Sequence, residues 1–235
     1  MESITRKTML YKSNVEFEDY SMNYVLGCSH GCNYPCYARL VKKVNSQDWI
    51  KPKIVSNTLE LLDKEIPRLK EKIKQVHLCF STDPFMYKQS GVVDLSLKVI
   101  EKLISNDINI KVLSKGLLPS ELIDIEKRYN KEPKTPNQYG ISLVSVNESF
   151  RGEFEPYSAP YTDRIESLRR LSESDIYTYI YMEPFYPDLM ILAYTEVRDP
   201  SFWWTSLGCV VLAFCLVMVI NIVVIFIMKR LGVKY

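Results

Sequence analysis

The sequence predicts an α/β fold of about five parallel strands, followed by one C-terminal transmembrane helix. Strand-like and helix-like segments alternate through residues 1–188 in units of ~30 residues or more, a spacing typical of parallel strands joined by right-handed crossovers. Residues 207–228 then form an uncharged apolar run that is long enough to cross a bilayer. The alternation fits an α/β barrel or a doubly wound sheet, and in both folds ligands bind where the strands end.

Five segments have the composition of strands, namely residues 23–27, 75–81, 108–114, 139–146 and 177–183. Helices are expected between them, over residues 57–73, 94–105 and 120–129 and around residues 163–171. Asn57 with Glu60 is expected to cap the first of these helices, and Asp163 with Glu166 to cap the last.

Polar side chains follow the predicted strands at or just beyond their ends: Asp83, Ser114, Lys115 and Glu183. Because parallel strands end at one edge of a sheet, these side chains are candidates for contact with a ligand. Asp83 fits equally well as a turn or helix-cap residue before Pro84.

Four parts of the chain are predicted: an α/β domain over residues 1–188, a linker and interface segment over 189–206, the transmembrane helix over 207–228 and a short basic tail over 229–235. Trp203 and Trp204 before the apolar run, with Lys229 and Arg230 after it, are typical flanks of a membrane span. We therefore expect a single-pass anchor in the lipid bilayer with the N-terminal domain in the cytoplasm, although the positive-inside rule alone favours a cytoplasmic tail. A buried core helix is the alternative.

Composition excludes a disordered or strongly basic chain, because 25% of the residues are charged, 47% are hydrophobic and the net charge is +2. Bulk charge therefore gives no support to nucleic-acid binding. The first residues lack the apolar region of a secretory signal, so the six cysteines are expected to be reduced.

Three cysteines, Cys28, Cys32 and Cys36, lie on one short loop after the first predicted strand. Soft thiolate ligands favour zinc or an iron–sulfur cluster. Zinc needs a fourth ligand, for which His30 is the candidate, but its closeness to Cys28 makes a tetrahedral site awkward. Three thiolates on a [4Fe–4S] cluster leave one iron open to another ligand.

The loop resembles that of the radical S-adenosylmethionine (radical SAM) superfamily, and within it the spore photoproduct lyase-like group, over roughly residues 20–188. The matching motifs are Gly27-Cys28-Ser29-His30-Gly31-Cys32, Ser81-Thr82-Asp83-Pro84, Val112-Leu113-Ser114-Lys115, Tyr139-Gly140-Ile141-Ser142, Phe154-Glu155-Pro156 with Arg164 to Leu171, and Met182-Glu183-Pro184-Phe185-Tyr186-Pro187. The resemblance implies a partial (β/α) radical SAM barrel. It also implies a [4Fe–4S] cluster that reductively cleaves S-adenosylmethionine to a 5′-deoxyadenosyl radical.

Carried over to this chain, the resemblance assigns site residues: metal ligands Cys28, Cys32 and Cys36, and cofactor contacts Tyr37, Lys115, Ser142 and Glu183. Tyr37 is expected beside the adenine, and the other three near the polar groups of the cofactor. The substrate is unknown, nucleic acid being suggested by the resemblance alone, and an unidentified electron donor is implied.

Two features depart from the resembling group. Pro35 adds a residue between the second and third cysteines, and Phe80 stands where the lyases have a hydrogen-donating cysteine. Cys79, one position earlier, is expected to point to the opposite face and pack in the core. Because relatives are expected to continue past the fifth strand, the alternative function is a truncated, non-catalytic metal-binding or membrane-tethered interaction module. A structural zinc protein is a third hypothesis.

Overall fold

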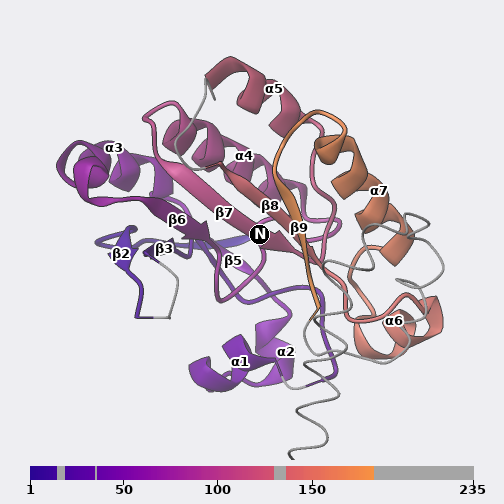
Figure 1. Ribbon diagram of the computed structural model, residues 1–235. Helices are drawn as coiled ribbons and strands as arrows, with labels where there is room; N and C mark the ends of the chain where they lie inside the picture. The colour runs from indigo at the N-terminus through magenta and orange to yellow at the C-terminus, as the bar shows by residue number, and fades with distance from the viewer. Residues whose placement is uncertain (15–18, 35, 130–135, 183–235) are drawn as a thin grey trace, which may run out of the picture. The chain divides into compact units, whose positions relative to one another are not determined.

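A six-stranded sheet lies at the centre of the fold (Figure 1). The computed structural model describes residues 1–14, 19–34, 36–129 and 136–182, all within one unit, Met1–Leu189. The strand order is β2-β3-β6-β7-β8-β9. The bounds are Tyr11–Lys12 (β2), Tyr20–Met22 (β3), Gln75–Leu78 (β6), Asn109–Ser114 (β7), Gln138–Ser142 (β8) and Thr178–Tyr181 (β9).

The parallel part of this sheet confirms the predicted α/β fold. Strands β3, β6, β7, β8 and β9 pair in parallel, and β2 alone pairs antiparallel, with β3. Neighbours in the sheet follow the order of the chain, which is the winding of a barrel rather than of a doubly wound sheet.

The first predicted strand is in the wrong place. The sheet uses residues 20–22, and the chain leaves it at Asn23, whose side-chain oxygen accepts hydrogen bonds from the backbone N–H and hydroxyl of Ser81. Residues 25–26 form β4 (Val25–Leu26) of a second sheet, ordered β1-β5-β4 with β1 at Glu2–Ile4 and β5 at Lys53–Val55. A short apolar run gives no indication of which sheet it joins.

Two predicted strands are also shorter than expected. Strand β6 ends at Leu78 because Cys79 has a φ of 51°, in the left-handed region that interrupts a strand. Strand β8 ends at Ser142 rather than at residue 146. The candidate residues Asp83, Lys115 and Ser142 consequently all lie at or beyond true carboxyl ends of strands.

Four longer helices follow one another around one side of the sheet (Figure 1): α3 (Thr58–Leu69), α4 (Ser90–Ile104), α5 (Glu121–Tyr129) and α7 (Tyr161–Ser172). All four were predicted. Three shorter helices were not: α1 (Tyr37–Lys42), α2 (Ser46–Trp49) and α6 (Glu148–Phe154). The 3₁₀ turn η1 (Lys70–Lys72) lies within the helix predicted over residues 57–73. Short helices show too few turns for an apolar period to be detected.

Both predicted capping boxes are wrong. Asn57 occupies the N-cap position of α3, but its side chain bonds to the backbone N–H and C=O of Arg6 instead of capping the helix. Helix α7 begins earlier than expected, after Pro160, which places Asp163 and Glu166 inside the helix. In α3 the Asn57 side chain binds a distant backbone segment instead of the helix start. In α7 the helix begins after a proline, before the predicted capping residues.

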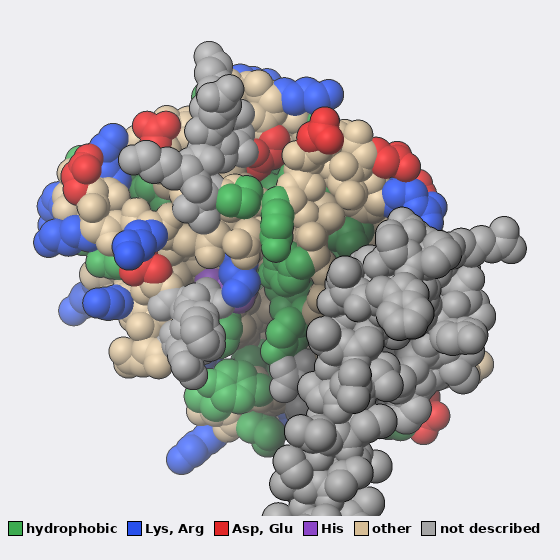
Figure 2. Space-filling model, in the orientation of Figure 1, with side chains coloured by type: hydrophobic (Ala, Val, Ile, Leu, Met, Phe, Trp, Pro, Cys, Tyr) green, Lys and Arg blue, Asp and Glu red, His purple; other side chains and the backbone are tan. Residues whose placement is uncertain are grey.

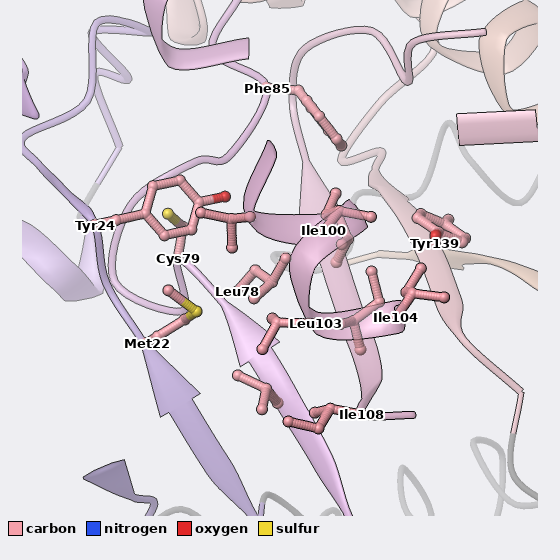
Figure 3. Close-up of a cluster of buried hydrophobic side chains, with 14 of the residues drawn as sticks. Met22, Tyr24, Leu78, Cys79, Phe85, Ile100, Leu103, Ile104, Ile108 and Tyr139 are labelled. Atoms are coloured by element: carbon pink, nitrogen blue, oxygen red, sulfur yellow. The ribbon is translucent and has the colours of Figure 1, made fainter. Parts of the chain in front are cut away.

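The core lies between the sheet and the helices, and Figure 3 shows part of it, with Leu78 of β6 facing Ile100 and Leu103 of α4. Cys79 lies beside the Tyr24 ring in this cluster and is 2% exposed. Burial raises the pKa of the Cys79 thiol to about 12, so it is a packed neutral thiol, as expected from the sequence.

The predicted membrane localisation is not supported. In the ranges that the structure describes, no helix has the length and apolar character needed to cross a bilayer, α4 being the longest of them with 15 residues. The predicted span, residues 207–228, and the segments 189–206 and 229–235 lie outside the described residues. The expectation of a membrane anchor and a lipid partner is therefore corrected. It depended on apolarity and length, which identify a candidate span but do not establish one.

Candidate functional site

The cysteine loop, residues 27–36, leaves the small sheet after β4 and leads into α1. Its turn at Gly31 has a φ of 60°, and a Cβ there would lie 2.8 Å from the ring of Tyr157. Glycine therefore meets two requirements at this position, a left-handed backbone and close contact with an aromatic ring. Cys36 is the N-cap residue of α1.

Cys28, Cys32 and Cys36 are free thiols, each partly exposed. Burial raises the pKa of Cys28 well above its ordinary value. Burial also raises the pKa of Cys32, to about 11, although the positive charge of Lys115 acts to lower it. In the described part of the chain, no three His, Cys, Asp or Glu side chains are grouped closely enough to hold a metal ion, and residue 35 of this loop is not described. The donor chemistry, three reduced thiols on one loop, nevertheless suits an iron–sulfur cluster.

His30 has a structural role in the fold, which weakens the zinc alternative. Its ring is 1% exposed, and Nε2 accepts a hydrogen bond of 3.0 Å from the backbone N–H of Tyr87. Burial lowers the pKa of His30, although the charge of Asp83 opposes this. Nδ1 lies 3.5 Å from Oδ2 of Asp83 without hydrogen-bond geometry. Nε2 is therefore occupied by the backbone of Tyr87 and is not available as the fourth ligand of a zinc site.

Asp83 joins two strand ends through its carboxylate. Oδ1 accepts hydrogen bonds from the Phe85 N–H (2.8 Å) and the Ser114 hydroxyl (2.7 Å), and Oδ2 accepts one from the Lys115 N–H (2.7 Å). The bond to Phe85 closes the turn around Pro84 that the sequence suggested. Asp83 therefore holds the segment after β6 against the end of β7.

A buried ionic cluster lies at the ends of β7 and β8, centred on Glu155. Its Oε1 is 2.7 Å from Nζ of Lys115, and its Oε2 is 2.8 Å from a guanidinium nitrogen of Arg164. The Glu155 and Arg164 side chains are both 0% exposed. Lys115 Nζ also donates to the hydroxyl of Ser142 (2.7 Å), and the Tyr34 hydroxyl donates to Oε1 of Glu155 (2.5 Å).

The charge of Glu155 predicts a dependence of stability on acid pH. Burial alone would raise the pKa of this carboxyl, but Lys115 and Arg164 overcome that effect and lower it from 4.5 to about 2. Because the folded-state pKa lies below the unfolded one, the stabilisation is complete above about pH 4.5 and is lost as the pH falls towards 2. We expect the free energy of unfolding, measured by urea titration, to decrease between about pH 4.5 and pH 2 in the native protein. The decrease should exceed that in Glu155→Gln by on the order of 3 kcal/mol. Identical pH profiles for the two proteins would contradict this.

The structure brings together two of the cofactor contacts expected from the resemblance, Lys115 and Ser142. Tyr37 is 63% exposed at the start of α1, next to Cys36. Glu183 lies outside the described residues. These roles stay predictions.

Sequence reasoning did not single out Glu155 or Arg164 as site residues. One local signal was present: Arg164 falls on the same face of α7 as Leu168 and Leu171, and a charged residue in an apolar stripe indicates a buried ion pair. Glu155 had no such periodic signal, since it follows a short helix that was not predicted. Both residues do lie in one of the motifs that carry the family resemblance, Phe154-Glu155-Pro156 with Arg164 to Leu171, but no role was assigned to them there.

A hollow of about 430 Å³ opens beside the cysteine loop. Its lining includes Ser29, Lys88, Arg151, Tyr157 and Ser158, from three different connections at the carboxyl ends of the strands. A larger hollow of about 540 Å³ lies at the opposite ends of β8 and β9, far along the chain from the thiols, and carries none of the candidate residues. Figure 2 shows hydrophobic side chains gathered down the middle of the face turned to the viewer; in β9, Ile180 and Tyr181 are exposed.

Solved structures of spore photoproduct lyase share this fold. One, complexed with dinucleoside spore photoproduct, has a TM-score of 0.60 and 17% identity, and the match covers 79% of this chain and 51% of the lyase. Another, a mutant lyase with bound AdoMet and dinucleoside spore photoproduct, has a TM-score of 0.60 and 15% identity, covering 77% of this chain and 50% of the lyase. The chain thus spans about half the length of these lyases, and at such identities the likeness concerns the fold.

Among curated proteins, the chain is similar to the uncharacterised protein MJ0683 of Methanocaldococcus jannaschii, with 26% identity over 192 residues, 81% of this chain and 70% of that protein. The family model of the radical SAM superfamily matches residues 22–186, a range that contains the cysteine loop, Lys115, Ser142 and Glu155. The chain therefore belongs to the radical SAM superfamily.

Proposed function

We propose that this protein is a radical SAM enzyme that holds a [4Fe–4S] cluster with Cys28, Cys32 and Cys36. The observation that carries the proposal is the set of three free thiols on one loop of a chain with the radical SAM fold. With S-adenosylmethionine bound, the cluster would supply reductive cleavage of this cofactor, which starts radical chemistry on a substrate. An electron donor, as yet unidentified, is part of the proposal.

Two polar residues of the chain are proposed to bind S-adenosylmethionine. The Lys115 ammonium would pair with its carboxylate, and the Ser142 hydroxyl, already 2.7 Å from that ammonium, would bond to its polar groups. Both lie at strand ends, where ligands bind in barrels of this kind. Tyr37 beside the adenine, and Glu183, complete the proposed contacts.

A nucleic-acid lesion is the substrate class that we propose from the fold neighbours. Two of the lyases that share the fold are shown with dinucleoside spore photoproduct. Phe80 at the position of the lyase cysteine, with Cys79 buried in the core, distinguishes this chain from them, so hydrogen donation by a cysteine here is not part of the proposal.

Anaerobic reconstitution with iron and sulfide tests the proposed cluster. We expect iron and a charge-transfer absorption in the native protein, and almost complete loss of both in Cys28→Ala, Cys32→Ala and Cys36→Ala, because a three-thiolate site has no spare ligand. Cys79→Ala is the matched control, since it removes a thiol from the core and should retain the iron. Equal iron in all four variants would refute the assignment.

Product analysis separates the enzyme from the alternatives. Reduction of the loaded protein with S-adenosylmethionine should yield 5′-deoxyadenosine. Iron without this product would favour a non-catalytic metal-binding module, and stoichiometric zinc without iron would favour a structural zinc protein.

A further inference from the structure

Residues 153–159, which comprise the end of α6 and most of the segment that leads to α7, are here called the brace. They touch the cysteine loop along its backbone. The Asn33 N–H donates to the Phe154 carbonyl (2.9 Å), and the Tyr157 N–H donates to the His30 carbonyl (3.2 Å). These bonds join parts of the chain that are more than 100 residues apart, so the loop is held mainly by contacts outside itself.

The same segment also contacts the end of β7. The Ala159 N–H donates to the Lys115 carbonyl (3.1 Å), and the Glu155 carboxylate receives the Lys115 ammonium on Oε1. That oxygen also accepts the hydroxyl of Tyr34, a residue of the cysteine loop. One carboxylate oxygen is therefore shared by the loop that carries the thiols and by the cation proposed to bind the cofactor.

Arg164 fixes the carboxylate from its other side. Its guanidinium donates to Oε2 of Glu155 (2.8 Å), to the Ser142 carbonyl (2.8 Å) and to the Ala159 carbonyl (2.8 Å). A fully buried carboxylate held by two cations has little freedom to move, because each displacement would leave a charge without its partner.

We infer that Glu155 is a positioning residue that couples the cysteine loop to Lys115. The inference rests on the proposed function only for the role of Lys115. The loop's dependence on Glu155 is a property of the protein without cofactors. Removing the carboxylate charge should have two effects at once: it should loosen the cysteine loop and displace the Lys115 ammonium. A residue that only made a local contact would not affect both.

Backbone hydrogen exchange of the full chain without cluster tests the coupling. In Glu155→Gln, which keeps the shape and removes both ion pairs, we expect exchange across residues 30–34 to rise about tenfold or more, with exchange in α4 unchanged. Glu166→Gln is the matched control, because it removes the exposed carboxylate that pairs with Arg169 on α7. Exchange at residues 30–34 that is equal in the two variants would overturn the inference.

A second variant keeps the test decisive if Glu155→Gln does not fold. Tyr34→Phe removes one hydrogen bond to Glu155 and leaves both ion pairs. We expect a smaller rise of exchange in the same residues, and no rise there would contradict the coupling.

Affinity for S-adenosylmethionine, measured by equilibrium binding to the reconstituted protein per loaded cluster, tests the positioning of Lys115. It should fall about tenfold in Glu155→Gln and recover in part in Glu155→Asp, which restores the charge. A loss of thermal stability with unchanged affinity and unchanged loop exchange would mean a merely structural role and would overturn the inference. If the native protein bound no iron, the proposed function would fail, while the exchange experiment would still decide the coupling.

Discussion

Replacing Arg164 by methionine is expected to destabilise the protein by about 3–5 kcal/mol, a large part of the ~5–15 kcal/mol that stabilises an ordinary domain. Methionine has a similar length but no donors, so Glu155 loses a cation, and the carbonyls of Ser142 and Ala159 lose their hydrogen bonds. The cost arises from the polar groups left buried without partners more than from the attraction of the pair itself.

Urea titration at neutral pH measures this effect, with Arg169→Met as the control. Arg169 lies on the same helix, pairs with Glu166 and is 58% exposed, so its loss should change the free energy of unfolding little. Similar destabilisation by the two variants would show that the buried ionic cluster contributes no more to stability than an exposed ion pair.

Gly116→Ala is expected to be comparably severe, at about 3 kcal/mol or more, because a Cβ at this position would collide with the backbone carbonyl of Phe85. Neither backbone can move freely. The Gly116 N–H donates to the Ser114 hydroxyl, which in turn donates to Asp83, and Asp83 holds the Phe85 N–H. The strain would therefore reach the connection between the ends of β6 and β7.

Thermal unfolding, compared with Gly152→Ala, provides the measurement. Gly152 lies within α6, and a Cβ there meets no atom within 4 Å, so alanine should be neutral or slightly stabilising through its higher helix propensity. If Gly116→Ala unfolded at the temperature of the native protein, the tight packing between these two loops would be disproved.

Some of the residues at strand ends were predictable from the sequence. Lys115 follows a predicted strand, and parallel strands bring their carboxyl ends to one edge of the sheet. Ser142 fell inside the predicted strand 139–146 and was a candidate only through the family resemblance; because β8 ends at Ser142, its hydroxyl lies 2.7 Å from Nζ of Lys115. The cysteine motif was evident because three cysteines lie within nine residues, although Pro35 adds one residue between the second and third of them. Periodicity located the four longer helices because each has enough turns to show an apolar stripe, as in α4.

The features of the fold and of the site that could not be predicted depend on contacts between residues that are distant in the sequence. Residues 23–27 look more like a strand than residues 20–22 do, and the bond between Asn23 and the distant Ser81 accompanies the end of β3 at Met22. Asn57 has the local motif of a helix cap, yet Arg6 takes its side chain. Glu155 is the strongest example, since its partners come from the cysteine loop, β7 and α7, and no local pattern connects them.

The long separation between the cysteine loop and the brace has a consequence for biosynthesis. Strands β3, β6, β7 and β8 can join the six-stranded sheet in the order in which the ribosome produces them, because their order in the sheet is their order along the chain. The loop is translated early, but the residues that fasten it, such as Phe154 and Tyr157, emerge more than 100 residues later. The cysteine loop therefore lacks these backbone partners until about 120 further residues have been synthesised, and it can take its final conformation only after α6 and the brace have emerged.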